Sequence, residues 1–130
     1  MTLIDFEPHH LALIRPQEAQ RHEMTDAPVG RAWTVVHDGL PMMCGGLVEL
    51  WPGRAYAWAL LDRDAGPVML PMTRAIRSLL DRSGFRRIEM AVDVGFDPGR
   101  RWAVLLGFEL EATARRYMPH GGDAWIYVRL

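Results

Sequence analysis

The sequence is poor in several residue types, and each absence excludes a class of protein. It has one cysteine, Cys44, in 130 residues, which excludes an internal disulfide and a cysteine-rich zinc site. We expect Cys44 to be a small buried residue. Lysine is absent, so all 15 basic residues are arginine, and 16 acidic residues leave a net charge of −1. Without excess positive charge, non-specific binding to nucleic acid is disfavoured.

Long apolar runs and targeting segments are missing as well. Polar residues or glycine interrupt each apolar stretch within about ten residues, whereas a membrane-spanning helix needs ~20. The first ten residues, MTLIDFEPHH, carry acids and lack the basic and apolar regions of a signal peptide. We therefore expect a cytoplasmic protein that does not bind membranes. The length and a hydrophobic content of 49% predict one globular domain over residues 1–130.

Short periodic segments, separated by glycine and proline, predict the elements of the first half. A strand over 3–6 precedes a helix over 8–14, and Pro16 begins a second helix that ends near Met24. Alternating patterns then predict three antiparallel strands over 32–38, 42–51 and 54–62. Asp38-Gly39 and Pro52-Gly53 supply the turns between these strands.

The alternation of the third of these strands sorts its side chains into two faces. Tyr56, Trp58 and Leu60 share one face, and alanines at 55, 57 and 59 share the other. The alanine face allows another element to approach closely. The pair Gly45-Gly46 in the preceding strand marks either a bulge or a site of close packing.

The second half changes from period two to period 3.6 and back. Apolar residues at 72, 75, 76, 79 and 80 predict an amphipathic helix, with Pro71 in its first turn and Gly84 after its end. A strand over 86–94 follows, and Asp97 then caps a short helix that reaches 106. Strands over 108–118 and 123–130 flank the turn His120-Gly121-Gly122. The predicted fold is α/β, an α+β mixed sheet with the order βααβββαβαββ.

This order resembles the GNAT acetyltransferase superfamily over nearly the whole chain. The best local match is RRWAVLLGFELE, because GNAT proteins end their last helix in a Leu-Gly-Phe run, as at Leu106-Gly107-Phe108. The resemblance implies a splayed central sheet flanked by helices and an acetyl-CoA site in the second half. It also implies a loop before the long helix whose backbone N–H groups bind pyrophosphate.

The residues that should bind coenzyme A in such a protein depart from the GNAT pattern. The loop of the superfamily has Arg or Gln, two residues, Gly, any residue, and Gly or Ala. Here it reads Asp64-Ala65-Gly66-Pro67-Val68-Met69, so an acid, a proline and a large side chain replace the key residues. The Asn and Tyr expected in the last helix fall on Phe96 and Ala103, or one residue away on Asp97 and Trp102.

Short GNAT-like proteins with eroded loops of this kind occur in tailed bacteriophages and prophages. The stretches AWTVVHDGLPMMCGGL and RRWAVLLGFELEATARRYMPHGGDAWIY resemble that group. The resemblance implies a phage or prophage protein in the host cytoplasm or the virion, with a non-catalytic, virion-associated or binding role. Two alternatives stay open, an N-acyltransferase that uses acetyl-CoA with an unknown acceptor, and a module that binds a host protein. Homodimers are common in the superfamily.

If the protein is an enzyme, the resemblance points to a small set of site residues. Glu89 is the candidate general base, because it lies on the strand beside the expected cleft, and Tyr117 is an alternative acid. Both residues also have a purely structural interpretation. Glu89 would then be a solvent-facing or Arg-paired carboxylate, and Tyr117 a half-buried tyrosine. Acetyl-CoA would be held by the strand edge and the loop after it, at Leu60, Leu61, Arg63, Gly66 and Val68.

The five histidines do not predict a metal site. His9 and His10 are adjacent and the other three are scattered, so no pair has the i, i+4 spacing of a helix-borne site. We therefore expect no metal centre.

Overall fold

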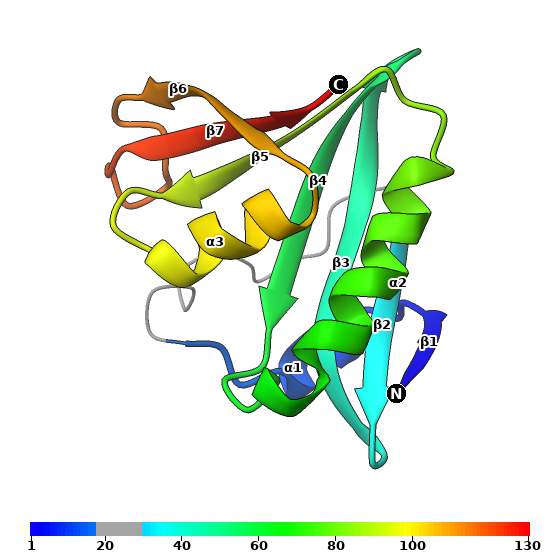
Figure 1. Ribbon diagram of the computed structural model, residues 1–130. Coiled ribbons are helices and arrows are strands. Elements are labelled where there is room, and N and C mark those ends of the chain that lie inside the picture. The colour runs from blue at the N-terminus through cyan, green and yellow to red at the C-terminus, as the bar shows by residue number, and fades with distance from the viewer. Residues whose placement is uncertain (18–29) are drawn as a thin grey trace.

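The computed structural model describes residues 1–17 and 30–130 of the chain, and these residues form one seven-stranded mixed sheet. The sheet has the order β1-β2-β3-β4-β5-β7-β6 (Figure 1). Its strands are β1 (Thr2–Asp5), β2 (Arg31–His37), β3 (Leu40–Trp51), β4 (Arg54–Leu61), β5 (Arg87–Asp93), β6 (Glu109–Ala114) and β7 (Ala124–Arg129). Neighbouring strands are antiparallel except for β4 and β5, which are parallel.

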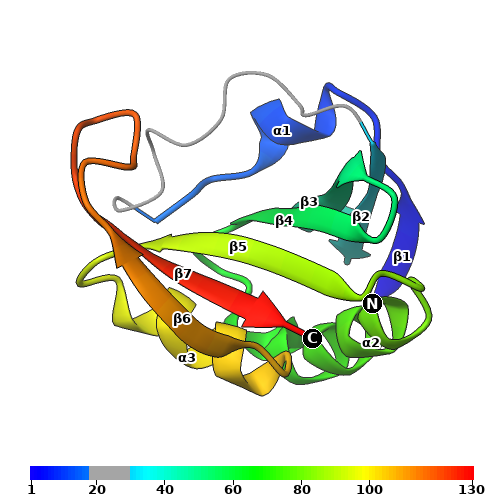
Figure 2. The same cartoon turned by 90° about the horizontal axis from the view of Figure 1, so that it is seen from above.

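Helices cover both faces of this sheet. They are α1 (His10–Leu13), a 3₁₀ turn η2 (Gly66–Val68), α2 (Met69–Asp81) and α3 (Asp97–Leu105). Figure 2 shows α1 on one side of the sheet and α2 and α3 on the other. Because α2 connects β4 to the parallel strand β5, the predicted βαβ crossover is present. None of the helices in the described part of the chain is long and apolar enough to cross a membrane.

The two faces of β4 belong to two separate cores, as the alternation predicts. Ala55, Ala57 and Ala59 pack under α2 and α3 with the larger cluster of buried residues. Trp58 and Leu60 pack on the opposite face, with Ile14 and Cys44. Cys44 is fully buried, as expected, and burial raises the pKa of its thiol.

Gly45 and Gly46 mark close packing between strands. A Cβ atom at Gly46 would lie 2.3 Å from the carbonyl oxygen of Arg31, and one at Gly45 would lie 2.9 Å from that of Trp58. The pairing of β2 with β3 is regular at both glycines, and its irregularity falls between Val35 and Val36. Of the two interpretations of this pair, the structure therefore favours packing over a bulge.

The structure corrects three of the predicted elements. The first helix is the single turn α1, shorter than the predicted 8–14. Pro16 begins no helix but pairs with Asp62 in an isolated antiparallel bridge, and most of the predicted helix 16–24 lies outside the described residues. Strand β6 ends at Ala114, so Tyr117 lies in the loop after the penultimate strand.

Candidate functional site

The candidate site is a cleft that opens where β4 and β5 separate. These parallel strands pair only at their beginnings, from Arg54↔Arg87 to Tyr56↔Glu89. No pairing between them follows Tyr56 in the described residues, and Figure 1 shows the ribbons of β4 and β5 diverging. In the described part of the chain, the next pairing along this edge of β4 is that of Asp62 with Pro16. The space between the strands is a cavity of about 650 Å³, which we call the cleft.

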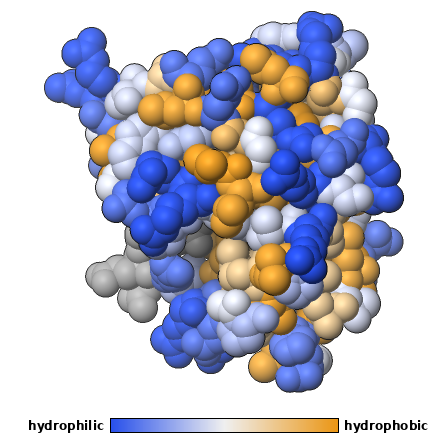
Figure 3. All heavy atoms as spheres, viewed as in Figure 1, coloured by the Kyte–Doolittle hydropathy of each residue, from blue (hydrophilic) through white to orange (hydrophobic). Residues whose placement is uncertain are grey.

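The walls of the cleft are mainly apolar. Small residues of the strands line it, namely Ala57, Ala59 and Ala91, and aromatic side chains are added by Phe96, just before α3, and by Trp102 within α3. Trp102 is fixed in place because its indole N–H donates to Thr73 Oγ1 of α2 at 2.9 Å. The alanine face of β4 thus leaves the room that larger side chains would fill. On the surface of this side, hydrophobic residues are exposed between hydrophilic ones (Figure 3).

Two acidic residues, Asp62 and Asp93, line the cleft, and Asp93 lies at the end of β5. Ile88, Met90 and Val92 pack in the core under α2 and α3. Alternation along the strand therefore turns Asp93 to the opposite face. Its side chain is largely buried, with the residue 9% exposed, and its Oδ1 lies 2.7 Å from Nε2 of His120.

The loop between β6 and β7 places His120 on Asp93. The N–H of Gly122 donates to Nδ1 of His120 at 3.2 Å, so in the neutral ring the proton sits on Nε2 and is donated to Asp93. The loop is closed by hydrogen bonds from Met118 N to Gly122 O and from Gly121 N to Met118 O. A Cβ atom at Gly122 would lie 2.3 Å from the ring of His120, so a larger residue there would displace it.

Sequence reasoning missed the pair of Asp93 and His120. The sequence pattern places His120 in a glycine turn and among the scattered histidines, and it places Asp93 within the strand over 86–94 without relating the two. The alternation of β5 does indicate that Asp93 shares a face with Glu89. The contact with His120, 27 residues away, depends on the path of a loop that no periodic pattern describes.

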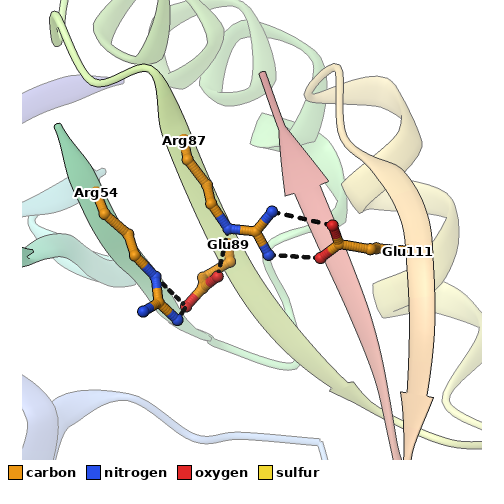
Figure 4. A network of polar contacts seen from close by, with 4 residues as sticks. All are labelled: Arg54, Arg87, Glu89 and Glu111. Carbon is orange, nitrogen blue, oxygen red and sulfur yellow. Dashed lines mark hydrogen bonds and ion pairs between the residues drawn. The ribbon is translucent and has the colours of Figure 1, made fainter.

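The structure places the predicted base, Glu89, outside the lining of the cleft. Its carboxylate accepts hydrogen bonds from Arg54 and from Arg87, and Arg87 also pairs with Glu111 (Figure 4). Burial acts to raise the pKa of Glu89, but the hydrogen bonds and charges of Arg54 and Arg87 outweigh it and hold this pKa below its usual value. A carboxylate held in this way accepts a further proton poorly.

The other predicted site residues divide between the cleft and the core. Leu61, Arg63, Gly66 and Tyr117 line the cleft. Leu60 faces the cluster on the α1 side, and Val68 is buried near Met42 and Ala65. Tyr117 is 51% exposed, which puts its ring at the surface of the protein. Their roles in binding or catalysis stay predictions.

One group of possible metal ligands does form near the N-terminus. Ligand atoms of Glu7, His9 and His10 lie within 4.8 Å of one another. Nδ1 of His10 lies 3.0 Å from the backbone nitrogen of Glu7 and 2.7 Å from Thr34 Oγ1, and Nε2 lies 3.9 Å from the Glu7 carboxylate. Nδ1 of His10 therefore already contacts two groups of the protein.

Comparison with known proteins identifies the fold. No protein-family model matches the sequence, and no curated protein matches it. Solved structures do match it in three dimensions. A SpeG spermidine N-acetyltransferase chimera from Vibrio cholerae and hSSAT is 13% identical with a TM-score of 0.76, covering 99% of this chain and 94% of that chain.

Two further structures show how far the likeness extends. A GNAT-family acetyltransferase from Bacillus anthracis is 10% identical with a TM-score of 0.72, covering 98% of this chain and 93% of that one. RimL, a ribosomal L7/L12 alpha-N-protein acetyltransferase in complex with coenzyme A, is 17% identical with a TM-score of 0.62. That match covers 77% of this chain and 61% of RimL. The protein has the fold of the GNAT acetyltransferases, a seven-stranded mixed sheet flanked by helices in the described residues.

Proposed function

We propose that the protein is an N-acyltransferase that takes an acyl thioester such as acetyl-CoA into the cleft between β4 and β5. The observation that carries this proposal is the open cleft itself, a cavity of about 650 Å³ between splayed parallel strands. Met69 lines this cavity without filling it. The complex of RimL with coenzyme A, on the same fold, supports a donor of this kind.

The residues of the cleft suit the transfer of an acyl group to an amine. An acceptor ammonium would give one proton to the carboxylate of Asp93, which His120 orients through its Nε2–H. The free amine would then attack the thioester carbonyl, forming the C–N bond as the C–S bond breaks. The second amine proton goes to the leaving thiolate, and the hydroxyl of Tyr117, which lines the same cleft, is the candidate group to deliver it.

Glu89 stays an alternative general base in this proposal, but it is a weaker candidate than Asp93. Both of its carboxylate oxygens accept hydrogen bonds from arginines, and it does not line the cleft. Asp93 is the better candidate because it lies in the wall of the cleft.

A non-catalytic binding role is the second candidate, and the loop before α2 favours it. The N–H groups of Val68 and Met69 donate within the turn, to the carbonyl oxygens of Ala65 and Gly66, so neither points at a ligand. The finer assignment to a phage or prophage protein, with a virion or host partner, rests on two stretches of sequence. The structural comparisons lend it no support.

Titration calorimetry with acetyl-CoA, followed by an assay for free thiol in the presence of amines, tests the first candidate. Spermidine and a peptide with an N-terminal amine are suitable first acceptors. We expect binding that is lost when Ala59→Phe fills the cleft. Thermal unfolding checks that the variant is folded. Absence of binding by the folded wild-type protein would exclude the acyltransferase and leave the binding role.

A further inference from the structure

The backbone of the loop before α2 is unable to bind a diphosphate in the usual way. Residues 65–71 include two prolines, Pro67 and Pro71, which have no N–H group. Three more N–H groups are used inside the loop, from Ala65 to Asp62 O, from Val68 to Ala65 O, and from Met69 to Gly66 O. Five of these seven residues, two prolines plus three bonded N–H groups, are thus without a free donor for a phosphate.

The charges beside the loop give a diphosphate little net attraction. Arg15 donates to both carboxylate oxygens of Asp62, at 3.2 and 3.1 Å, and to Asp64 Oδ2 at 2.9 Å. One guanidinium therefore meets two carboxylates. Burial acts to raise the pKa of Asp62, but its hydrogen bonds, led by those from Arg15, hold it below the usual value. An approaching diphosphate would face these two acids as well as Arg63, which lines the cleft, and Arg15 is already occupied by the acids.

In contrast to the loop before α2, the inner part of the cleft can accept a ligand. Between Tyr56 and Asp62 the edge of β4 faces a space lined by Ala57 and Ala59, with Trp102 on the side of α3. An extended chain that contains amides can pair with such a strand edge as an added strand does. The pantetheine arm of a thioester is a chain of that kind, whereas the nucleotide lies beyond it.

We propose that the protein recognises the acyl-pantetheine arm of its donor and gains little from the nucleotide end of coenzyme A. This inference rests on the proposed function, because it concerns the same cleft. The donor is then any acyl thioester on a pantetheine arm, either free or attached to a carrier protein. In this arrangement the arm lies along β4 up to Leu61, whereas Asp62, which also lines the cleft, and Asp64 lie beyond it on the way to the loop.

Calorimetry with four probes tests this inference on the full chain. They are acetyl-CoA, S-acetyl-pantetheine, adenosine 3′,5′-bisphosphate, and an acyl carrier protein that bears acetylated phosphopantetheine. We expect acetyl-CoA and S-acetyl-pantetheine to bind within about threefold of each other and the bisphosphate not to bind. Tighter binding of the loaded carrier than of both free thioesters would identify a carrier protein as the source of the arm, and equal or weaker binding would identify a free thioester.

A rebuilt loop provides the matched variant. Asp64→Gln with Pro67→Gly removes an acid and restores a donor at two exposed positions. We expect this variant to bind acetyl-CoA at least tenfold more tightly than S-acetyl-pantetheine, while Glu109→Gln on β6 keeps the wild-type ratio.

The outcomes separate the two proposals. If wild-type protein binds acetyl-CoA fiftyfold or more tightly than S-acetyl-pantetheine, or binds the bisphosphate, the inference is wrong and the acyltransferase proposal stands. If folded protein binds none of the thioesters, both are wrong.

Discussion

At the scale of single residues, the proposed acyl transfer depends on Asp93 and on the histidine that holds it. Asp93 is the acidic side chain in the wall of the cleft that is both largely buried and hydrogen bonded to an imidazole, at 2.7 Å. His120 does not act on the acceptor in this scheme. It positions Asp93, and the backbone of Gly122 positions His120 in turn.

Replacing Asp93→Asn should reduce turnover and leave donor binding intact. Asparagine keeps the size of the side chain but cannot take the proton of an ammonium, and general bases contribute about 10²–10⁴-fold to rate. Thiol release measures the turnover, and calorimetry with acetyl-CoA measures the binding. Equal loss of both would show that Asp93 shapes the cleft and does not act as the base.

Tyr117→Phe removes the hydroxyl of Tyr117 and keeps its ring, so it distinguishes the roles of the two. If this hydroxyl protonates the leaving thiolate, kcat should fall about 10-fold or more at an unchanged KM for the donor. Steady-state kinetics with a thiol assay provides the comparison. An unchanged kcat would mean that the exposed ring serves only as part of the wall.

At the scale of secondary-structure elements, ion pairs tie β4, β5 and β6 together beside the point where β4 and β5 part. Arg54 comes from β4, Arg87 and Glu89 from β5, and Glu111 from β6 (Figure 4). This network lies where the parallel strands are still paired. We interpret this network as the support that fixes the strands at the end of the cleft where β4 and β5 are still paired.

Glu89→Gln should destabilise the protein more than Glu111→Gln. The residue Glu89 is 8% exposed and accepts from two arginines, so its loss removes charged hydrogen bonds that are each worth about 1.5–3 kcal/mol. The Glu111 side chain is 42% exposed and its ion pair should contribute less than about 1 kcal/mol. Urea unfolding gives both values. A similar effect of both variants would contradict the supporting role of Glu89.

The same network predicts how stability depends on pH. The pKa of Glu89 is lowered in the folded protein, where hydrogen bonds from its arginines outweigh the opposing effect of burial. Its stabilising contribution is therefore complete above the ordinary Glu pKa of about 4.3 and is lost as pH falls through the lower folded value. Urea unfolding between pH 6 and pH 3 should show this decline, and Glu89→Gln should flatten part of it. An identical decline in the variant would exclude Glu89 as a source.

The contact between α2 and α3 should also be measurable. Thr73→Val removes the oxygen that accepts the indole N–H of Trp102 and leaves this buried donor without that partner, at a cost of about 1–3 kcal/mol. Thr73→Ser keeps the hydroxyl and should cost less. Thermal unfolding compares the two, and equal destabilisation would show that the methyl group of Thr73, and not the hydrogen bond, matters.

Sequence patterns predict the elements of this fold better than its site. The faces of β4 and the helix α2 follow from periods of two and 3.6, because each is half buried along its length. The bridge of Pro16 to Asp62 and the contact of His120 with Asp93 join segments far apart in the chain. Such contacts depend on tertiary packing, which periodicity does not encode.

At the scale of the whole molecule, the fold supplies a cleft wherever two parallel strands of a twisted sheet are allowed to separate. Here the separation follows Tyr56 and Glu89, and alanines on β4 keep the space open. The loop before α2 departs from the GNAT pattern, but the cleft is open. This combination is why we favour a thioester-binding enzyme with altered donor recognition.

The most direct test of this account is an amide NMR titration of the ¹⁵N-labelled protein with acetyl-CoA. We predict shifts confined to the strand edges and the helix that line the cleft, at residues 57–61, 91–93 and 96–102, with little change at 65–71. Shifts centred on the loop at 65–71 would contradict our description of donor recognition. No shift at millimolar acetyl-CoA, in a protein with a well-dispersed spectrum, would contradict the proposal that the cleft binds an acyl thioester.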